Sequence, residues 1–238
     1  MKAALVGYGK MGKAIEHILV ERGHSIVSII DIDNQEDFQS EAFKSADVAI
    51  EFSTPSAAYI NYLKCFAANV AVVAGTTGWL EHLDEIKALC ANEEQTFFYA
   101  SNYSLGVNLF FKINQYLAKL MNNFPQYDVS VSETHHIHKL DAPSGTAITL
   151  AEDIFKQIER KNRWTLEKNN DPSEMYIETI REGEAAGTHV ISYESDIDSI
   201  QIGHCSKNRT GLALGAVLAA EFSVGKKGFL GMNDLLQF

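Results

Sequence analysis

The amino-acid sequence predicts an α/β protein with a doubly wound parallel sheet and a second, α+β domain. Two observations predict the first domain. Short apolar runs alternate with amphipathic stretches over the first hundred residues, and a glycine-rich loop follows the first run. Near-continuous apolar strands that alternate with helices are typical of a parallel sheet covered on both faces. Beyond residue 120, strands that alternate polar and apolar residues indicate a sheet with one face packed on helices.

Five apolar runs are expected to form the parallel strands of the first domain. They are Ala3–Val6, Ser25–Ile30, Asp47–Phe52, Val70–Ala74 and Thr96–Tyr99. Helical spacing of apolar residues separates them, as in the stretch Met11–Leu19, and Gly23 is placed to end that first helix. Pro55 marks the start of the next helix, and Leu80–Leu89 carries a further one.

The second half of the chain has a different pattern, and its final helix, Thr210–Phe222, fits either domain. The other expected elements are a helix over Leu105–Met121, a strand over Tyr127–Thr134, a helix from about Thr146, a polar surface loop over Arg160–Glu174, and strands over Tyr176–Arg181, Thr188–Ser195 and Ser199–His204. An uncovered face of the second sheet would suit an oligomer interface.

Composition excludes several classes of function. The chain has 238 residues, with 20 Lys and Arg against 31 Asp and Glu, a formal charge of −11. Nucleic acids and anionic lipids both require a basic surface, so we expect neither as a partner. The three cysteines, Cys65, Cys90 and Cys205, lack the spacing of zinc ligands or of a disulfide framework. With no signal peptide and no membrane span apparent, we expect a soluble, cytoplasmic protein.

The loop Gly7-Tyr8-Gly9-Lys10-Met11-Gly12 lies between a strand and a helix, where a dinucleotide-binding loop is expected. Glycines there allow backbone N–H groups to approach a pyrophosphate at the helix N-terminus. Asp31, at the end of the next strand, is placed to accept hydrogen bonds from the adenosine ribose. A structural glycine turn is the alternative, but strand, helix and acid together favour a Rossmann-like domain.

Two further loops follow strands at the same edge of the sheet, where ligands bind in open α/β sheets. Either alone could be an ordinary turn, but together they suit a nicotinamide pocket. The residues expected to bind the cofactor are Gly7, Tyr8, Gly9, Lys10, Met11, Gly12, Asp31, Gly75, Thr76, Thr77, Ala100, Ser101, Asn102 and Tyr103. Asp31 and Asp33 would repel a 2′-phosphate, which Lys10 could partly offset, so NADH should serve at least as well as NADPH.

The densest group of reactive side chains lies within Glu133–Ala147. It contains three histidines, His135, His136 and His138, and Lys139 follows them. One hypothesis is metal binding, although no carboxylate or thiolate cluster evidently completes a ligand set. The other is proton transfer beside an anionic substrate. Pro143-Ser144-Gly145-Thr146 opens a helix whose free N–H groups would receive a carboxylate. Ser144 would also serve as N-cap, and Asp141 is expected to brace the loop.

The run from His135 through Lys139 and Asp141 to Pro143-Ser144-Gly145-Thr146-Ala147 resembles the signature of the dihydrodipicolinate reductase family, of lysine and diaminopimelate biosynthesis. The glycine loop and the loops at Gly75 and Ala100 occur in the family's order, so the resemblance covers nearly the whole chain. It implies NADH- or NADPH-dependent reduction of a small cyclic dicarboxylate by a homotetramer. It also implies a dinucleotide-binding domain of residues 1–103 and 209–238, with a substrate-binding and tetramerisation domain of residues 104–208.

The resemblance also implies roles for individual residues. His135 would be the general acid/base, Lys139 the proton donor, and the substrate would be held by His136, Ser144, Gly145 and Thr146. Two positions depart from the family pattern: Ser130 replaces an acid, and Asp31-Ile32 stands where an acid–arginine pair is frequent. Two alternatives remain, another two-domain nicotinamide-dependent amino-acid or semialdehyde dehydrogenase, and a non-catalytic dinucleotide sensor.

Overall fold

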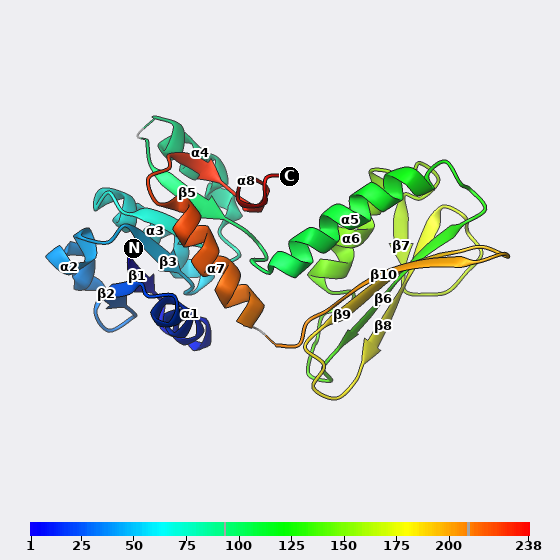
Figure 1. Ribbon diagram of the computed structural model, residues 1–238, viewed down its shortest axis with the longest axis horizontal. Coiled ribbons are helices and arrows are strands. Elements are labelled where there is room, and N and C mark those ends of the chain that lie inside the picture. The colour runs from blue at the N-terminus through cyan, green and yellow to red at the C-terminus, as the bar shows by residue number, and fades with distance from the viewer. Residues whose placement is uncertain (93, 209) are drawn as a thin grey trace. The chain divides into compact units, whose positions relative to one another are not determined.

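The computed structural model describes residues 1–92, 94–208 and 210–238. The chain divides into two compact units: unit 1 comprises Met1–Leu105 and Thr210–Phe238, and unit 2 comprises Gly106–Arg209 (Figure 1). No helix within the described ranges is both long and apolar enough to cross a membrane.

Unit 1 contains a six-stranded, fully parallel sheet in the order β11-β5-β4-β3-β1-β2. Its strands are β1 (Lys2–Val6), β2 (Ser25–Ile30), β3 (Val48–Glu51), β4 (Ala71–Ala74), β5 (Thr96–Tyr99) and β11 (Gly228–Leu230). The strand order reverses at β1, whose neighbours are β2 and β3. Val6, the last residue of β1, is level with Ile30 and Glu51, so the loops after these three strands meet at one edge.

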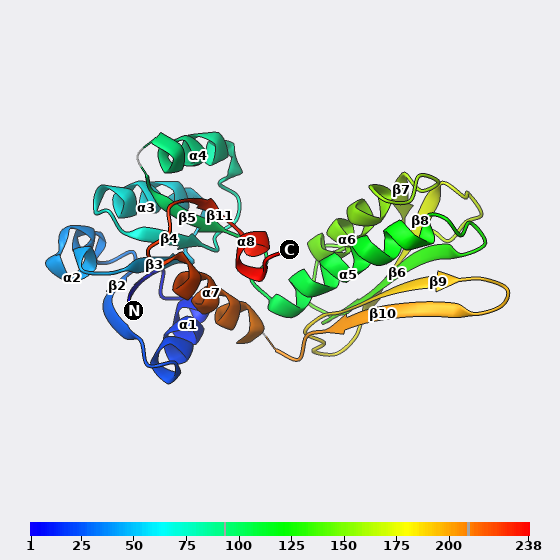
Figure 2. The same ribbon diagram turned by 45° about the horizontal axis from the view of Figure 1, so that its top comes forward.

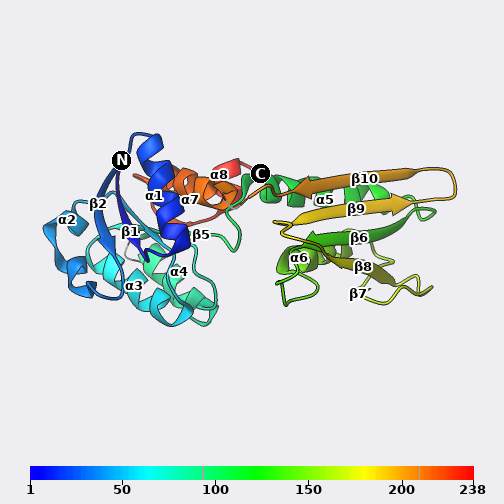
Figure 3. The same ribbon diagram turned by 90° about the horizontal axis from the view of Figure 1, so that it is seen from below.

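Helices cover both faces of this sheet, as the sequence predicts. They are α1 (Lys10–Glu21), α2 (Glu41–Lys44), α3 (Pro55–Ala67), α4 (Leu83–Asn92), α7 (Thr210–Ser223) and α8 (Met232–Leu236), with 3₁₀ turns at Gln35–Gln39 and Leu80–His82. Figure 3 shows α1 and α7 on one side of the strands and α3 and α4 on the other. Successive strand residues therefore enter different cores: Leu5 packs with Ile15 and Val217, whereas Val6 packs with Tyr62.

Unit 2 contains a mixed five-stranded sheet in the order β10-β9-β6-β8-β7. Its strands are β6 (Asp128–His135), β7 (Arg163–Thr165), β8 (Glu174–Arg181), β9 (Thr188–Glu194) and β10 (Ser199–Cys205). Helices α5 (Leu105–Met121) and α6 (Gly145–Phe155) run along one face, as Figure 2 shows. Val129, Val131 and Ile191 pack against them, whereas the intervening Ser130, Ser132 and Ser192 face the other way and are only partly buried.

The structure corrects one expected element and adds others. The predicted loop Arg160–Glu174 contains β7, in which Arg163 pairs with Glu174 of β8. Beside it, Lys161 is buried, with Nζ 2.7 Å from the Asp128 carboxylate and 2.6 Å from the Glu174 carbonyl oxygen. The sequence of this segment is polar and therefore predicted a surface loop. In the structure, partners elsewhere in the chain satisfy its polar groups, so it can form a strand. The elements α2, β11 and α8 were also not predicted.

Candidate functional site

In the glycine loop of unit 1, Gly7 and Gly12 lie so close to neighbouring backbone that neither position can hold a side chain. Gly7 has φ +90°, and a Cβ there would lie 2.1 Å from the Phe52 carbonyl oxygen, so a side chain is excluded. A Cβ on Gly12 would lie 2.4 Å from the Gly7 carbonyl oxygen, so α1 can begin against the loop only with glycine there. The N-terminus of α1 thus follows β1 directly and presents its first N–H groups at the carboxyl edge of the sheet.

Two adjacent pockets lie along this edge and share Gly9, Phe52 and Ser53. The first, of about 400 Å³, is lined by Gly7, Tyr8, Asp31, Ile32 and neighbouring residues. The second, of about 490 Å³, is lined also by Lys10, Met11, Pro55, Gly75, Thr76 and Thr77. A long ligand with a charged centre, such as a dinucleotide, fits this pair of hollows beside a helix N-terminus.

Asp31 occupies the position predicted for the ribose acceptor. Its Oδ2 accepts the Tyr8 N–H at 3.2 Å and its Oδ1 accepts the Ile32 N–H at 2.9 Å. These bonds hold the carboxylate at the wall of the smaller pocket. The side chain of Ile32 beside it is 82% exposed and brings no charge.

The predicted loop Ala100–Tyr103 contributes differently. Tyr103 is buried, and its hydroxyl donates to the Ala74 carbonyl oxygen at 2.8 Å, so its side chain supports the core. Asn102 Oδ1 accepts the Ser104 N–H at 2.9 Å. None of the four predicted residues lines either pocket. Phe52 and Ser53, which line both, were missed, although they follow β3 at the edge where such residues are expected.

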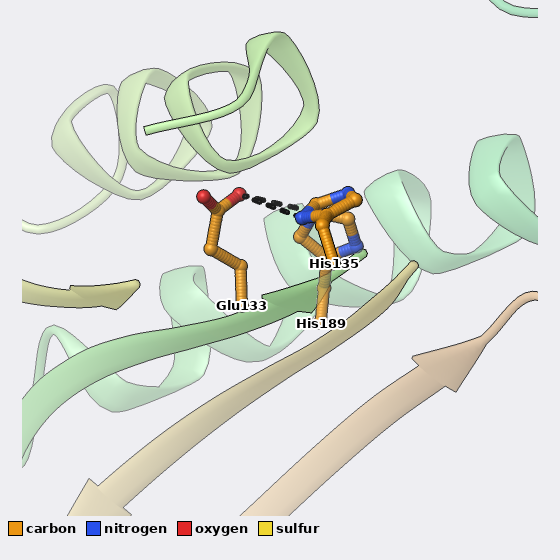
Figure 4. Close-up of side chains that lie close together, drawn as sticks. All are labelled: Glu133, His135 and His189. Carbon is orange, nitrogen blue, oxygen red and sulfur yellow. Dashed lines mark ion pairs between the residues drawn. The ribbon is translucent and has the colours of Figure 1, made fainter. Parts of the chain in front are cut away.

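Strand β6 of unit 2 ends at the predicted site of proton transfer. Glu133 and His135 point to the same face because side chains alternate along a strand. Glu133 has no exposed surface and His135 is 8% exposed. His189 reaches the same place from β9, and its ring centre lies 5.1 Å from that of His135. Figure 4 shows the three side chains converging.

The Glu133 carboxylate is the centre of this buried group. Its Oε2 lies 3.6 Å from both His135 Nδ1 and His189 Nε2. Ser144 donates its N–H to the carboxylate at 3.0 and 3.2 Å, and Arg181 Nη2 donates to Oε1 at 3.3 Å. Four groups from four segments of unit 2 therefore converge on one side chain.

Helix α6 begins next to this carboxylate. Ser144 is its N-cap: the Ser144 Oγ accepts the Ala147 N–H at 3.2 Å and lies 3.1 Å from His189 Nε2. Within the described residues, the N–H groups of Gly145 and Thr146 donate no hydrogen bond, and a Cβ on Gly145 would touch nothing within 4 Å. The first turn thus offers two N–H groups and the positive end of the helix dipole.

The loop between β6 and α6 carries Lys139, a further residue of the predicted site. Its Nζ lies 2.8 Å from Asp141 Oδ2, which therefore braces it. Arg181 donates to the carbonyl oxygens of Lys139 at 3.3 Å and of Asp141 at 2.6 Å. The other histidines differ: His136 Nδ1 is buried with no partner among the described residues, whereas the His138 side chain is 71% exposed.

Burial and charge set opposite ionisation states for Glu133 and His135. Burial opposes a charge on Glu133, but the interactions with His189 and Ser144 outweigh it and lower the pKa of Glu133 to about 2. Burial lowers the pKa of His135 to about 4, against the opposing effect of Glu133. At neutral pH the carboxylate is therefore charged and the His135 imidazole neutral.

Glu133, His135 and His189 offer three potential metal-ligand atoms, all within 4.8 Å of one another. The sequence indicated no complete ligand set; the structure brings His189 of β9 beside Glu133 and His135 of the neighbouring strand β6. The Ser144 N–H and the Arg181 guanidinium already occupy this carboxylate. The cation of Arg181 disfavours a second cation beside it, so we interpret the group as a hydrogen-bonding network.

The low pKa of His135 predicts acid lability. Unfolding returns this pKa from about 4 toward 6.5, so the unfolded chain binds a proton that the folded chain refuses as pH falls through this window. The free energy of unfolding should fall by about 1–3 kcal/mol between pH 6.5 and 4 from this residue, and no further below it. Urea denaturation at both pH values should show a smaller loss for His135→Gln than for wild type. The exposed His17, changed to Gln, is the control; an equal loss in His135→Gln and wild type would contradict the prediction.

Comparison with known proteins places this architecture. The family model described as "Dihydrodipicolinate reductase, N-terminus" matches residues 1–103, and the family model described as "Dihydrodipicolinate reductase, C-terminus" matches residues 106–236. The chain belongs to the dihydrodipicolinate reductase family. It is 47% identical over 236 residues (99% of this chain, 98% of the relative) to a protein of Christiangramia forsetii named 4-hydroxy-tetrahydrodipicolinate reductase. It is 35% identical over 201 residues (82% and 76%) to a protein of that name from Methanoregula boonei.

A solved structure agrees on the fold. The dihydrodipicolinate reductase of Paenisporosarcina sp. TG-14, solved with dipicolinate bound, superposes with a TM-score of 0.79 at 24% identity, covering 98% of each chain. The family membership and the Rossmann-like parallel sheet with a second, α+β domain, both predicted from the sequence, are confirmed. In this member of the dihydrodipicolinate reductase family, the site also contains Glu133, His189 and Arg181. The sequence assigned no role to these three residues.

Proposed function

We propose that the protein is a 4-hydroxy-tetrahydrodipicolinate reductase, which uses NADH or NADPH to form tetrahydrodipicolinate in diaminopimelate and lysine biosynthesis. The observation that carries the proposal is in unit 2: the two N–H groups of Gly145 and Thr146 lie at a helix N-terminus joined through Glu133 to His135. A carboxylate acceptor, a titratable imidazole and the Lys139 ammonium are what a small cyclic dicarboxylate requires. The names and identities of the relatives support the same substrate.

Unit 1 supports the cofactor part of the proposal. Residues Gly7 through Gly12 would hold the pyrophosphate, Asp31 the adenosine ribose, and Gly75–Thr77 the nicotinamide end; the family resemblance adds contacts from Ala100–Tyr103, which line neither pocket. The two hollows and the glycines that no side chain can replace fit such a ligand. When bound, the reduced nicotinamide supplies a hydride.

The residues of unit 2 would do the remaining chemistry. Loss of water from the hydroxylated ring leaves a conjugated C=N/C=C system, and its reduction requires one hydride and one proton. The N–H groups of Gly145 and Thr146, with His136, would hold the carboxylates, and Ser144 would fix the start of α6 as its N-cap. His135 or Lys139 would deliver the proton.

The assay that tests this function follows the oxidation of NADH or NADPH with enzymatically generated 4-hydroxy-tetrahydrodipicolinate. Absence of oxidation with either cofactor, together with dinucleotide binding, would favour a sensor instead. A semialdehyde dehydrogenase would require a reactive cysteine, and the exposed Cys205, at the end of β10, is the accessible candidate of the three. Cys65 and Cys90 are buried in unit 1, and burial raises the pKa of Cys90 to about 11. Such thiols are poor nucleophiles.

We also propose that NADH serves at least as well as NADPH. A 2′-phosphate would meet the Asp31 carboxylate, and Ile32 offers it no positive charge. Ile32→Arg should raise kcat/KM for NADPH relative to NADH by about tenfold, because it would supply a charge-assisted hydrogen bond. Val20→Arg, at another exposed apolar position of unit 1, is the control. A wild-type kcat/KM that favours NADPH by about tenfold, or about 1.4 kcal/mol, would contradict the charge argument.

We also propose a cytoplasmic location and a homotetramer built on the second domain, which is the assembly that the family resemblance implies. The face of the unit 2 sheet opposite α5 and α6 supports this, because Ser130, Ser132 and Ser192 give it small side chains that no described helix covers. Small side chains allow two such sheets to approach closely.

A further inference from the structure

We propose that Glu133 is a positioning residue for proton transfer: its carboxylate orients the His135 ring with Nδ1 inward and stabilises the protonated ring while substrate is bound. This inference rests on the proposed function and assigns the proton to His135 Nε2. Glu133 itself touches neither substrate nor cofactor. It acts through His135, as a buried carboxylate acts on the imidazole of a catalytic triad.

The geometry of the His135 ring supports this role. Nδ1 is buried, has no hydrogen-bond partner among the described residues, and lies 3.6 Å from Glu133 Oε2. Such contacts are commonly long without substrate and shorten in the complex. On the other side, a Cβ on Gly187, which has φ +139°, would lie 3.2 Å from Nε2. Glycine at that position therefore leaves room around the outward nitrogen.

The carboxylate cannot readily turn away from the ring. Its Oε1 is held by Arg181 at 3.3 Å, and the Ser144 N–H approaches both oxygens at 3.0 and 3.2 Å. Arg181 also holds the carbonyl oxygens of Lys139 and Asp141. Glu133 and Arg181 together thus connect the imidazole, the lysine loop and the start of α6.

Charge explains why the ring must be assisted. The groups that face His135 are Glu133 on its own strand, His189 on β9, Arg181 on β8 and Lys139 in the loop, and only Glu133 favours protonation. A bound dianion adds negative charge near the ring, so the pKa of His135 should rise in the complex. Without Glu133, two cations and a second imidazole would oppose that rise.

The proton step balances as follows. The electron pair of the enamine C=C bond forms a C–H bond with the proton on Nε2, the Nε2–H bond breaks, and its electron pair returns to the imidazole ring. The proton on Nδ1 remains directed at Glu133. The ring regains a proton from solvent before the next turnover.

The test compares wild type with Glu133→Gln, Glu133→Asp and the control Glu152→Gln, which removes an exposed acid from α6. Glu133→Gln should lower kcat by about 10²-fold and move the alkaline limb of the kcat–pH profile downward by about one pH unit. Glu133→Asp should restore the limb toward the wild-type pH, and the control should match wild type. A parallel NMR titration of the His135 ring nitrogens with dipicolinate should show a smaller rise in pKa in Glu133→Gln than in wild type.

Two results would overturn the proposal. One is a kcat in Glu133→Gln within about threefold of wild type. The other is a lowered kcat with an unmoved alkaline limb, which would mean that Glu133 only supports the fold. If wild type fails to reduce the substrate, the proposed function falls, and the dipicolinate titration alone decides on Glu133: equal His135 pKa values in both proteins would reject it.

Discussion

Replacing His135 or Lys139 with alanine is expected to lower kcat by about 10²–10⁴-fold, the usual contribution of a general acid. The His135 ring lies between the Glu133 carboxylate and the space beside Gly187, and Lys139 is held by Asp141 at 2.8 Å. In the proposed mechanism, removing either group deletes a proton donor or a fixed positive charge beside a dianionic substrate. Steady-state kinetics at saturating cofactor measure the effect.

The matched control for this pair is His138→Ala. His138 lies in the same loop, but its side chain is 71% exposed; its Nε2 lies 3.6 Å from the Glu184 carboxylate, and its ring lies beside that of His136. It should retain near-wild-type kcat. Near-wild-type turnover in both His135→Ala and Lys139→Ala would remove the basis for the proposed chemistry. If only one variant loses activity, that residue delivers the proton, a choice that the sequence left open.

Gly215→Ala is expected to cost about 3 kcal/mol of unfolding free energy, the upper part of the range for overpacked cores. A Cβ on Gly215 would lie 1.7 Å from the Tyr103 carbonyl oxygen and 2.7 Å from its carbonyl carbon. Backbone cannot rotate away as a side chain can, so α7 would have to move off the sheet. Chemical denaturation followed by circular dichroism measures the loss.

Gly211→Ala, in the same helix, is the matched control and should have the opposite sign. A Cβ there meets only Ser104 Oγ, at 3.8 Å, which is ordinary van der Waals contact. Because alanine restricts the unfolded chain more than glycine does, this variant should be more stable by about 0.5–1 kcal/mol. Equal stabilities of the two variants would show that the contact between Gly215 and Tyr103 is looser than described.

The sequence predicted correctly those strands and helices whose own residues carry a signal, such as apolar periodicity or a glycine at the end of a helix. The strand Thr96–Tyr99 and the helix Leu105–Met121 have the predicted bounds, and Gly23 ends α1 with φ +77°. In contrast, β7 and β11 have three residues each and owe their existence to the strands that they pair with, so no periodicity revealed them. Short strands of this kind are specified by partners distant in sequence.

The candidate site likewise has a part that the sequence predicted and a part that it did not. The Glu133–Ala147 run indicated a histidine beside a helix N-terminus because all its residues are consecutive. The partners His189 and Arg181 come from strands far along the chain, and only the sheet order brings them to Glu133. A single sequence offers no signal for such a meeting. Phe52 and Ser53 could have been found, because they lie where the predicted strand Asp47–Phe52 ends, at the ligand-binding edge.

Unit 1 is assembled from two segments that are separated in the chain by all of unit 2. During synthesis, Met1–Leu105 leaves the ribosome without α7, and the apolar face that Ala213, Ala216 and Val217 later cover stays open until the intervening hundred or so residues have followed. At about 5–20 residues per second, this exposure lasts several seconds or more. The nascent chain is therefore a natural client for holding chaperones at that stage, whereas unit 2, which is continuous, can fold as soon as it emerges.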